Sequence, residues 1–122
     1  QVIAAIRYAT NGFYASVMQE FSQMPVSENM QPLQCVLQEL QEKYIAMVDL
    51  MQTDNLKDYI DAMSRRLVEM AGYIIMGYLL VQDACANDYL FGKSARVFVA
   101  YIAAEVDKHC SYIKRFVSIG RC

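Results

Sequence analysis

The sequence predicts an all-α protein, folded as an antiparallel up-and-down four-helix bundle in a single domain over residues 1–122. The chain has only two prolines and five glycines, so long helices are rarely interrupted. Apolar residues recur every three or four positions in four segments, which is the period of a helix with one buried face. The links between these segments are short, and short links make successive helices antiparallel neighbours.

Composition and charge exclude two classes of partner. Of the 122 residues, 56% are hydrophobic and 20% are charged, which is enough apolar surface to offset the entropy lost on folding. The 11 basic and 13 acidic residues are interleaved and leave a formal net charge of −2. The chain therefore has no basic face for nucleic acid and no polybasic anchor for anionic lipid.

The first two helices are separated by a polar link that contains both prolines. The first helix is predicted from about Val2 to Met24, because Pro25 ends it. The second is predicted from Pro32, since proline is tolerated in a first helical turn. The two apolar stripes are Ile6, Ala9, Phe13, Val17, Phe21 and Met24, then Leu33, Leu37, Leu40, Tyr44, Met47 and Met51. The back of the second helix is polar: Gln34, Gln38, Glu39, Gln41, Glu42 and Lys43.

The third and fourth helices form the second half of the chain. The third is predicted over about 55–86, with capping side chains in Thr53-Asp54-Asn55. Asn87-Asp88 and Phe91-Gly92 break the pattern, so the fourth helix is predicted from Ser94 or nearby to about Ile119, before Gly120. Their stripes are Leu56, Ile60, Met63, Leu67, Met70, Ile74 and Val81, then Ala95, Phe98, Ile102, Val106, Ile113 and Phe116.

One stretch of the third helix, MAGYIIMGYLLV at 70–81, contains no charged residue. Twelve helical residues rise roughly 18 Å, short of the roughly 30 Å hydrocarbon layer of a membrane. Glu69 and Asp83 bound the stretch, so it is not expected to span a bilayer. The fourth helix has a similar run, VFVAYIAA at 97–104, and the two runs lie at the same end of an antiparallel hairpin.

That end of the bundle carries more apolar surface than a four-helix core requires. Two explanations are open: a thick core with the first helix wrapped across it, or a docking face for another domain or subunit. The tyrosines could place their rings in an interface with their hydroxyls at its wet rim. The candidate interface residues are Tyr73, Ile75, Met76, Leu79, Leu80, Val97 and Tyr101.

The sequence offers no catalytic, cofactor-binding or metal-ligating residues. A di-metal site in a bundle needs two Glu-x-x-His pairs, and the chain has one histidine, His109. Glu105 and His109 have the spacing of a surface pair on one helix. The alternative function is a stand-alone signalling bundle of the phosphotransfer type that uses His109, although the usual lysine and glycine do not follow the histidine.

Gly92-Lys93-Ser94 looks like the end of a phosphate-binding loop, but Asn87 takes the place of the first glycine and a helix precedes it instead of a strand. An anion at this helix start, with Lys93 on its phosphate, remains open.

Cysteine usage and the N-terminus favour a cytoplasmic protein. The four cysteines, at 35, 85, 110 and 122, lack C-x-x-C spacing, and we expect small buried thiols in a reducing compartment in preference to a disulfide framework. No signal peptide is visible. Because the chain begins at Gln1, we expect it to be a piece of something longer.

Two segments resemble a known family: LKDYIDAMSRRLVEMAGYIIMGYLLVQDA and FGKSARVFVAYIAAEVDKHCSYIKRFVSIG. Over about 56–120 they resemble the helical C-terminal domain of flavin-dependent acyl-CoA dehydrogenases. The points of likeness are Gly72 and Gly77 in the apolar run, Ala84 at its end, residues 95–101, and Gly120.

The resemblance implies a non-catalytic accessory domain. Enzymes of this kind oxidise an acyl-CoA thioester with FAD and a glutamate base in upstream catalytic domains. FAD would therefore belong to the parent enzyme, with no cofactor in this fragment. The partners implied are the catalytic domains of the parent, and a homo-oligomer is expected.

Overall fold

The computed structural model describes residues 12–53 and 56–120. In this part of the chain every regular element is helical, which confirms the predicted all-α class. The elements are α2 (Phe13–Ser22), a 3-10 turn η1 (Glu28–Met30), α3 (Gln31–Met51), a second 3-10 turn η2 (Lys57–Tyr59), α4 (Ile60–Ala86) and α5 (Asp88–Gly120).

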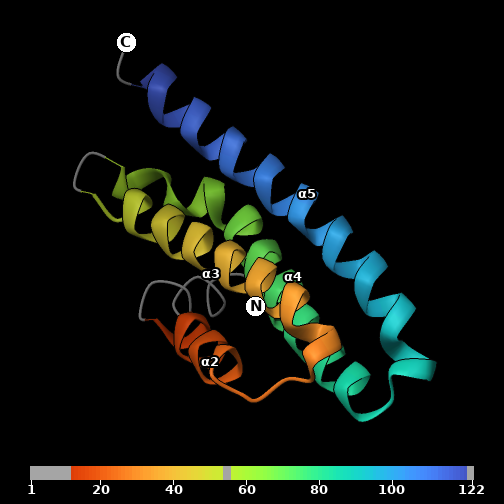
Figure 1. Cartoon of the computed structure of the whole chain (residues 1–122). Coiled ribbons are helices and arrows are strands. Elements are labelled where there is room, and N and C mark those ends of the chain that lie inside the picture. The colour runs from red at the N-terminus through yellow and green to blue at the C-terminus, as the bar shows by residue number, and fades with distance from the viewer. Residues whose placement is uncertain (1–11, 54–55, 121–122) are drawn as a thin grey trace.

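The four helices pack as an antiparallel bundle with α4 at its centre. α4 packs against α2, α3 and α5, and α3 also packs against α2 and α5. Figure 1 shows the two longest helices, α4 and α5, as a hairpin, with the short α2 on the far side of the α3–α4 pair from α5. The described part of the first helix is therefore remote from the outer face of the hairpin.

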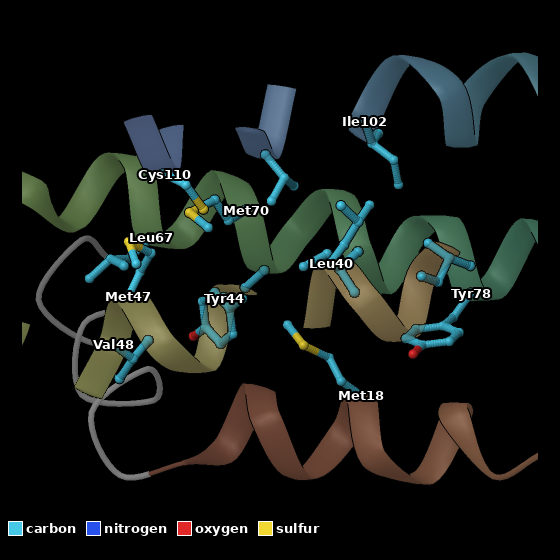
Figure 2. Packing of buried hydrophobic residues seen from close by; sticks show 14 of the residues in the cluster. Met18, Leu40, Tyr44, Met47, Val48, Leu67, Met70, Tyr78, Ile102 and Cys110 are labelled. Atoms are coloured by element: carbon cyan, nitrogen blue, oxygen red, sulfur yellow. The ribbon is translucent and has the colours of Figure 1, made fainter. Parts of the chain in front are cut away.

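The first helix differs from its predicted stripe. Its predicted start at Val2 lies outside the described residues, and α2 ends at Ser22. Met18 is its fully buried residue, whereas Phe13 and Met24 are exposed. Met18 reaches the core because its flexible thioether fills the gap between α2 and α3, as Figure 2 shows.

The inward stripe of α3 is confirmed from Leu37 to Met51, with Leu33 half-buried. The prediction of a polar back is wrong at Gln34 and Gln41, which are both buried. The Gln34 amide donates to the carbonyl oxygens of Phe21 and Ser22, at 3.1 and 3.3 Å. Gln34 thus satisfies carbonyl groups at the end of α2 that have no partner within that helix.

Gln41 connects three helices through a buried hydrogen-bond chain. Its amide donates to Gln19 Oε1 of α2 at 3.0 Å, and its own Oε1 accepts from the Tyr78 hydroxyl of α4 at 2.6 Å. Burial raises the pKa of Tyr78 well above its ordinary value, so the phenol stays a donor. A polar side chain that finds both partners can be buried at low cost.

The capping prediction for the third helix is wrong at Thr53. Its hydroxyl donates to the Leu50 carbonyl oxygen at 2.9 Å, so it closes α3 instead of opening the next helix. Residues 54 and 55 lie outside the described residues. α4 begins at Ile60 after the η2 turn, without a side-chain cap.

The fourth helix begins earlier than predicted, at Asp88. Asn87 supplies the cap, because its Oδ1 accepts from the Leu90 amide at 3.0 Å. Phe91 and Gly92 therefore do not break the helix. Gly92 is inside it, where a Cβ would collide with the Asp88 carboxylate and the Arg96 guanidinium. Asp88 is held in this place by Arg96 at 3.4 Å and by Asn29 at 3.1 Å.

Among the helices that the structure describes, α4 is the one with the length and composition of a membrane-crossing helix. One 18-residue window within Ile60–Ala86 has a mean hydropathy of 1.2, and 44% of it is buried inside the bundle. A central core helix meets the same criteria. Because α4 packs against all three other helices, the bundle explains the buried part of this apolar window.

Gly77 lets three helices approach closely. A Cβ placed on Gly77 would lie 2.6 Å from Leu37 Cδ2 and 2.8 Å from Ile102 Cδ1, and both of those side chains are fully buried. Gly72, on the same helix, has nothing within 4 Å of its Cβ position. Both glycines thus lie inside α4, but the Cβ position of Gly77 is crowded and that of Gly72 is open.

We predict opposite effects of Gly77→Ala and Gly72→Ala on stability. Alanine favours a helix over glycine by about 1 kcal/mol, so Gly72→Ala should raise the free energy of unfolding. Gly77→Ala should lower it by about 1–3 kcal/mol, because the new methyl overpacks Leu37 and Ile102. Urea unfolding measures both, and a stabilised Gly77→Ala variant would show that the helices are not in close contact there.

Candidate functional site

The outer face of the α4–α5 hairpin carries exposed apolar side chains next to the turn that joins the two helices. They include Met76 (54%), Leu79 (48%), Val97 (71%) and Tyr101 (51%). We call this surface the hairpin face and define it by seven residues: Tyr73, Met76, Leu79, Leu80, Val97, Phe98 and Tyr101.

The hairpin face is hollowed along its middle. A hollow of about 340 Å³ is lined by Met76, Leu79, Leu80, Asp83 and Phe98. A second, of about 570 Å³, is lined by Leu80, Lys93, Ser94, Val97, Phe98 and Tyr101. Both are lined by Leu80 and Phe98, so the two hollows lie next to each other between the helices, and together we call them the groove.

Helical spacing explains why these side chains share one face. In α5 the residues that enter the core include Ala95, Val99 and Ile102, so Val97 and Tyr101 point away from it. The same holds in α4 for Met76 and Leu79, which flank the buried Gly77 and Tyr78. The apolar runs of the two helices are thus divided between the core and the hairpin face.

Two tyrosines close the groove at the end far from the turn. The rings of Tyr73 and Tyr101 meet edge to face, with centroids 6.0 Å apart and planes at 87°. Hydrogen bonding to Tyr101 is the main cause that raises the pKa of Tyr73, to about 12. The Tyr73 phenol therefore stays neutral at ordinary pH, and both tyrosines place hydroxyl groups at the rim of an apolar surface.

The structure brings together six of the predicted interface residues and separates one. Five of them line the hollows, and Tyr73 joins them through its ring contact with Tyr101, whereas Ile75 is half-buried and lines neither hollow. Sequence reasoning missed Phe98, which was assigned to the core stripe but lines both hollows. The spacing of Ser94, Phe98 and Tyr101 along one helix could have shown it.

His109 is the second candidate from the sequence, and the structure changes its role. The predicted surface pair with Glu105 is wrong: His109 is only 7% exposed, and Glu105 instead accepts from Lys108 at 2.9 Å. His109 Nε2 lies 3.0 Å from Glu69 Oε2 of α4. This contact does not have the geometry of a hydrogen bond, so the buried Nε2 has no hydrogen-bond partner among the described residues.

Burial is the largest influence on His109 and lowers the pKa of its imidazole, while Glu69 acts in the opposite direction. The ring is therefore neutral in the folded protein and shielded from solvent. A phosphodonor needs an accessible nitrogen, so the structure does not favour the phosphotransfer alternative.

The anion site suggested at Gly92-Lys93-Ser94 is also not supported. These residues lie inside α5, past its first turn, where the backbone amides are within the helix instead of free at its start. Among the residues that the structure describes, no three His, Cys, Asp or Glu side chains gather as a metal site would need. Cys35, Cys85 and Cys110 are free thiols, and the prediction that they are buried is wrong at Cys35, which is exposed, while Cys85 is half-buried and Cys110 is buried.

Fold and site together define a helical accessory domain, with an apolar face and no catalytic cluster in the described part of the chain. Residues 10–118 match the family model described as "Acyl-CoA dehydrogenase C terminal". The chain belongs to this family of acyl-CoA dehydrogenase C-terminal domains.

A solved structure agrees with this assignment. The chain is similar to the acyl-CoA dehydrogenase family protein from Porphyromonas gingivalis, with 32% sequence identity and a TM-score of 0.85. The match covers 91% of this chain and 96% of that chain. No curated protein matches the sequence.

We predict that acid destabilises the protein through His109. Its pKa is lower in the folded state than in the unfolded chain. The contribution of the neutral ring to stability is therefore complete above about pH 6.5, the ordinary pKa of histidine. It is lost as the pH falls from there through the folded-state pKa. The free energy of unfolding should decrease between about pH 7.5 and 5.5, and His109→Gln should reduce that slope.

The neighbouring charges that act on the ring are Glu69, Lys108 and Glu105. If Glu69 outweighed burial, the protein would instead become more stable as the pH fell over this range. Urea unfolding at both pH values distinguishes the two cases, and His109 is the chain's one histidine.

Proposed function

We propose that this domain has no catalytic role of its own and uses the hairpin face to pack against the catalytic domains of its acyl-CoA dehydrogenase or against a partner subunit. The observation that carries the proposal is the pair of adjacent apolar hollows between α4 and α5, bordered by exposed Met76, Leu79, Val97 and Tyr101. Apolar patches of this kind mark interaction surfaces.

Burial of the hairpin face would supply the required free energy. Several hundred Å² of apolar surface at about 25 cal/mol per Å² amounts to on the order of 10 kcal/mol before the costs of association. The tyrosine pair and the charged residues at the rim leave polar groups at the edge, which is the usual anatomy of a protein interface.

The proposal extends to the enzyme as a whole. Family membership supports FAD in the upstream catalytic domains, with no cofactor held by this domain. We also propose a homo-oligomeric enzyme in the cytoplasm, in keeping with the free thiols of Cys35, Cys85 and Cys110.

Cysteine labelling tests whether the hairpin face is covered in the enzyme. In a Val97→Cys variant, we expect the new thiol of the dilute 122-residue chain to react about as fast as the exposed native Cys35. In the full-length enzyme, we expect the reaction of Cys35 to be unchanged and that at position 97 to slow by about tenfold or more, because the interface excludes the reagent.

Mass spectrometry of the peptides measures the extent of labelling at each cysteine separately, so the native thiols serve as internal references. Equal labelling of position 97 in the short chain and in the full-length enzyme would refute the proposed function.

A further inference from the structure

Of the chain's eight methionines, six are buried in the core and two are exposed. The buried ones are Met18, Met30, Met47, Met51, Met63 and Met70. The exposed ones are Met76 on the hairpin face, at 54%, and Met24 in the link after α2, at 41%. A dissolved oxidant attacks the thioethers that it can reach, so burial should direct it to Met24 and Met76.

The surroundings of Met76 on the hairpin face are apolar, apart from one carboxylate. Met76 lines the smaller hollow together with Leu79, Leu80, Phe98 and Asp83. The Asp83 carboxylate accepts hydrogen bonds and does not donate them. Among the described side chains that line this hollow, none can therefore donate a hydrogen bond to an oxygen atom placed on Met76.

Hydrogen peroxide converts a thioether to a sulfoxide in one two-electron step. The sulfur of Met76 attacks one peroxide oxygen, the O–O bond breaks, and an S–O bond forms. The sulfur is oxidised, the peroxide is reduced, and the second oxygen leaves as water with both hydrogens. The product is a polar side chain in place of a flexible apolar one.

A sulfoxide at position 76 opposes packing of the hairpin face. Its oxygen is hydrated while the face is open and loses that water when a partner surface covers it. The lining side chains supply no donor in exchange, so the cost of desolvation falls on the packed state alone. The same oxygen on Met24 has no such effect, because Met24 lines neither hollow.

We propose that Met76 is an oxidation site at which hydrogen peroxide prevents the hairpin face from packing. The inference rests on the proposed function, because it concerns the same contact. Oxidation requires an open face and the sulfoxide then keeps it open, so the reaction acts on chains that have not yet packed or have come apart. In the packed enzyme the partner surface shields Met76. Reduction of the sulfoxide restores the thioether and with it the contact.

Peroxide treatment followed by mass spectrometry of the peptides tests the site itself. In the 122-residue chain, we expect Met76 and Met24 to gain one oxygen at comparable rates, about tenfold or more faster than the six buried methionines. In the full-length enzyme, Met24 should react as before. Met76 should react about tenfold or more slowly there, because the covered face excludes the oxidant.

Two variants of Met76 test the effect on packing without peroxide. Met76→Gln places a permanently polar side chain of similar length at this position, whereas Met76→Leu is apolar and has no thioether. In full-length enzymes that also carry Val97→Cys, labelling at position 97 should be about tenfold faster with Met76→Gln than with Met76. Met76→Leu should leave the rate unchanged. Met24→Gln, the same change at the other exposed methionine, is the matched control and should also leave it unchanged.

Two results would overturn the inference: oxidation of Met76 in the 122-residue chain as slow as that of the buried methionines, or labelling at position 97 that Met76→Gln does not accelerate. In the second case position 97 is still covered, so the proposed function stands and only the role of Met76 is wrong. If position 97 of the enzyme with native Met76 is labelled as fast as in the short chain, the proposed function itself fails and the inference falls with it.

Discussion

The architecture depends on the close approach of α3, α4 and α5 around Gly77. With no side chain at this position, Leu37 of α3 and Ile102 of α5 reach the backbone of α4 and fill the space with fully buried groups. Because α3 occupies this inner side of the hairpin and α2 packs beyond it, on α3 and α4, the described helices leave the outer side of the hairpin uncovered. The hairpin face is therefore a consequence of how the core is assembled.

Buried polar groups fix how the shorter helices lie on this core. Gln41 bonds to both Gln19 and Tyr78, and Gln34 binds the carbonyl groups at the end of α2, so a shift of α2 along α3 would leave several buried groups without partners. Apolar contacts alone, many of them to flexible methionines, would permit such a shift more easily. The rest of the core in Figure 2 is apolar, with Leu40, Tyr44, Leu67 and Met70 between the helices.

The sequence predicts the buried face of a helix well where apolar periodicity determines it. It predicts poorly where a contact of one particular side chain determines burial or the start of a helix. The stripes of α3 and α4 follow directly from apolar spacing. Gln34 and Gln41 were assigned to the surface because their burial depends on partners in α2 and α4 that a linear pattern does not reveal. The start of α5 was placed at Ser94 because Gly92 resembles a helix breaker, whereas Asn87 supplies the cap and the Asp88 side chain fills the space beside that glycine. His109 was expected at the surface for a similar reason, since Glu69 lies on another helix.

The central claim is that the exposed side chains of the hairpin face lie outside the core, and two valines of α5 test it directly. Val97 is 71% exposed on that face, while Val99 is 3% exposed in the core. Alanine raises helix propensity equally at both positions, so the difference between the variants reports burial. In dilute, monomeric protein, Val97→Ala should leave the free energy of unfolding unchanged or slightly higher, and Val99→Ala should lower it by about 1–2 kcal/mol. An equal loss in both variants would contradict the account, because the hairpin face would then be part of the chain's own core.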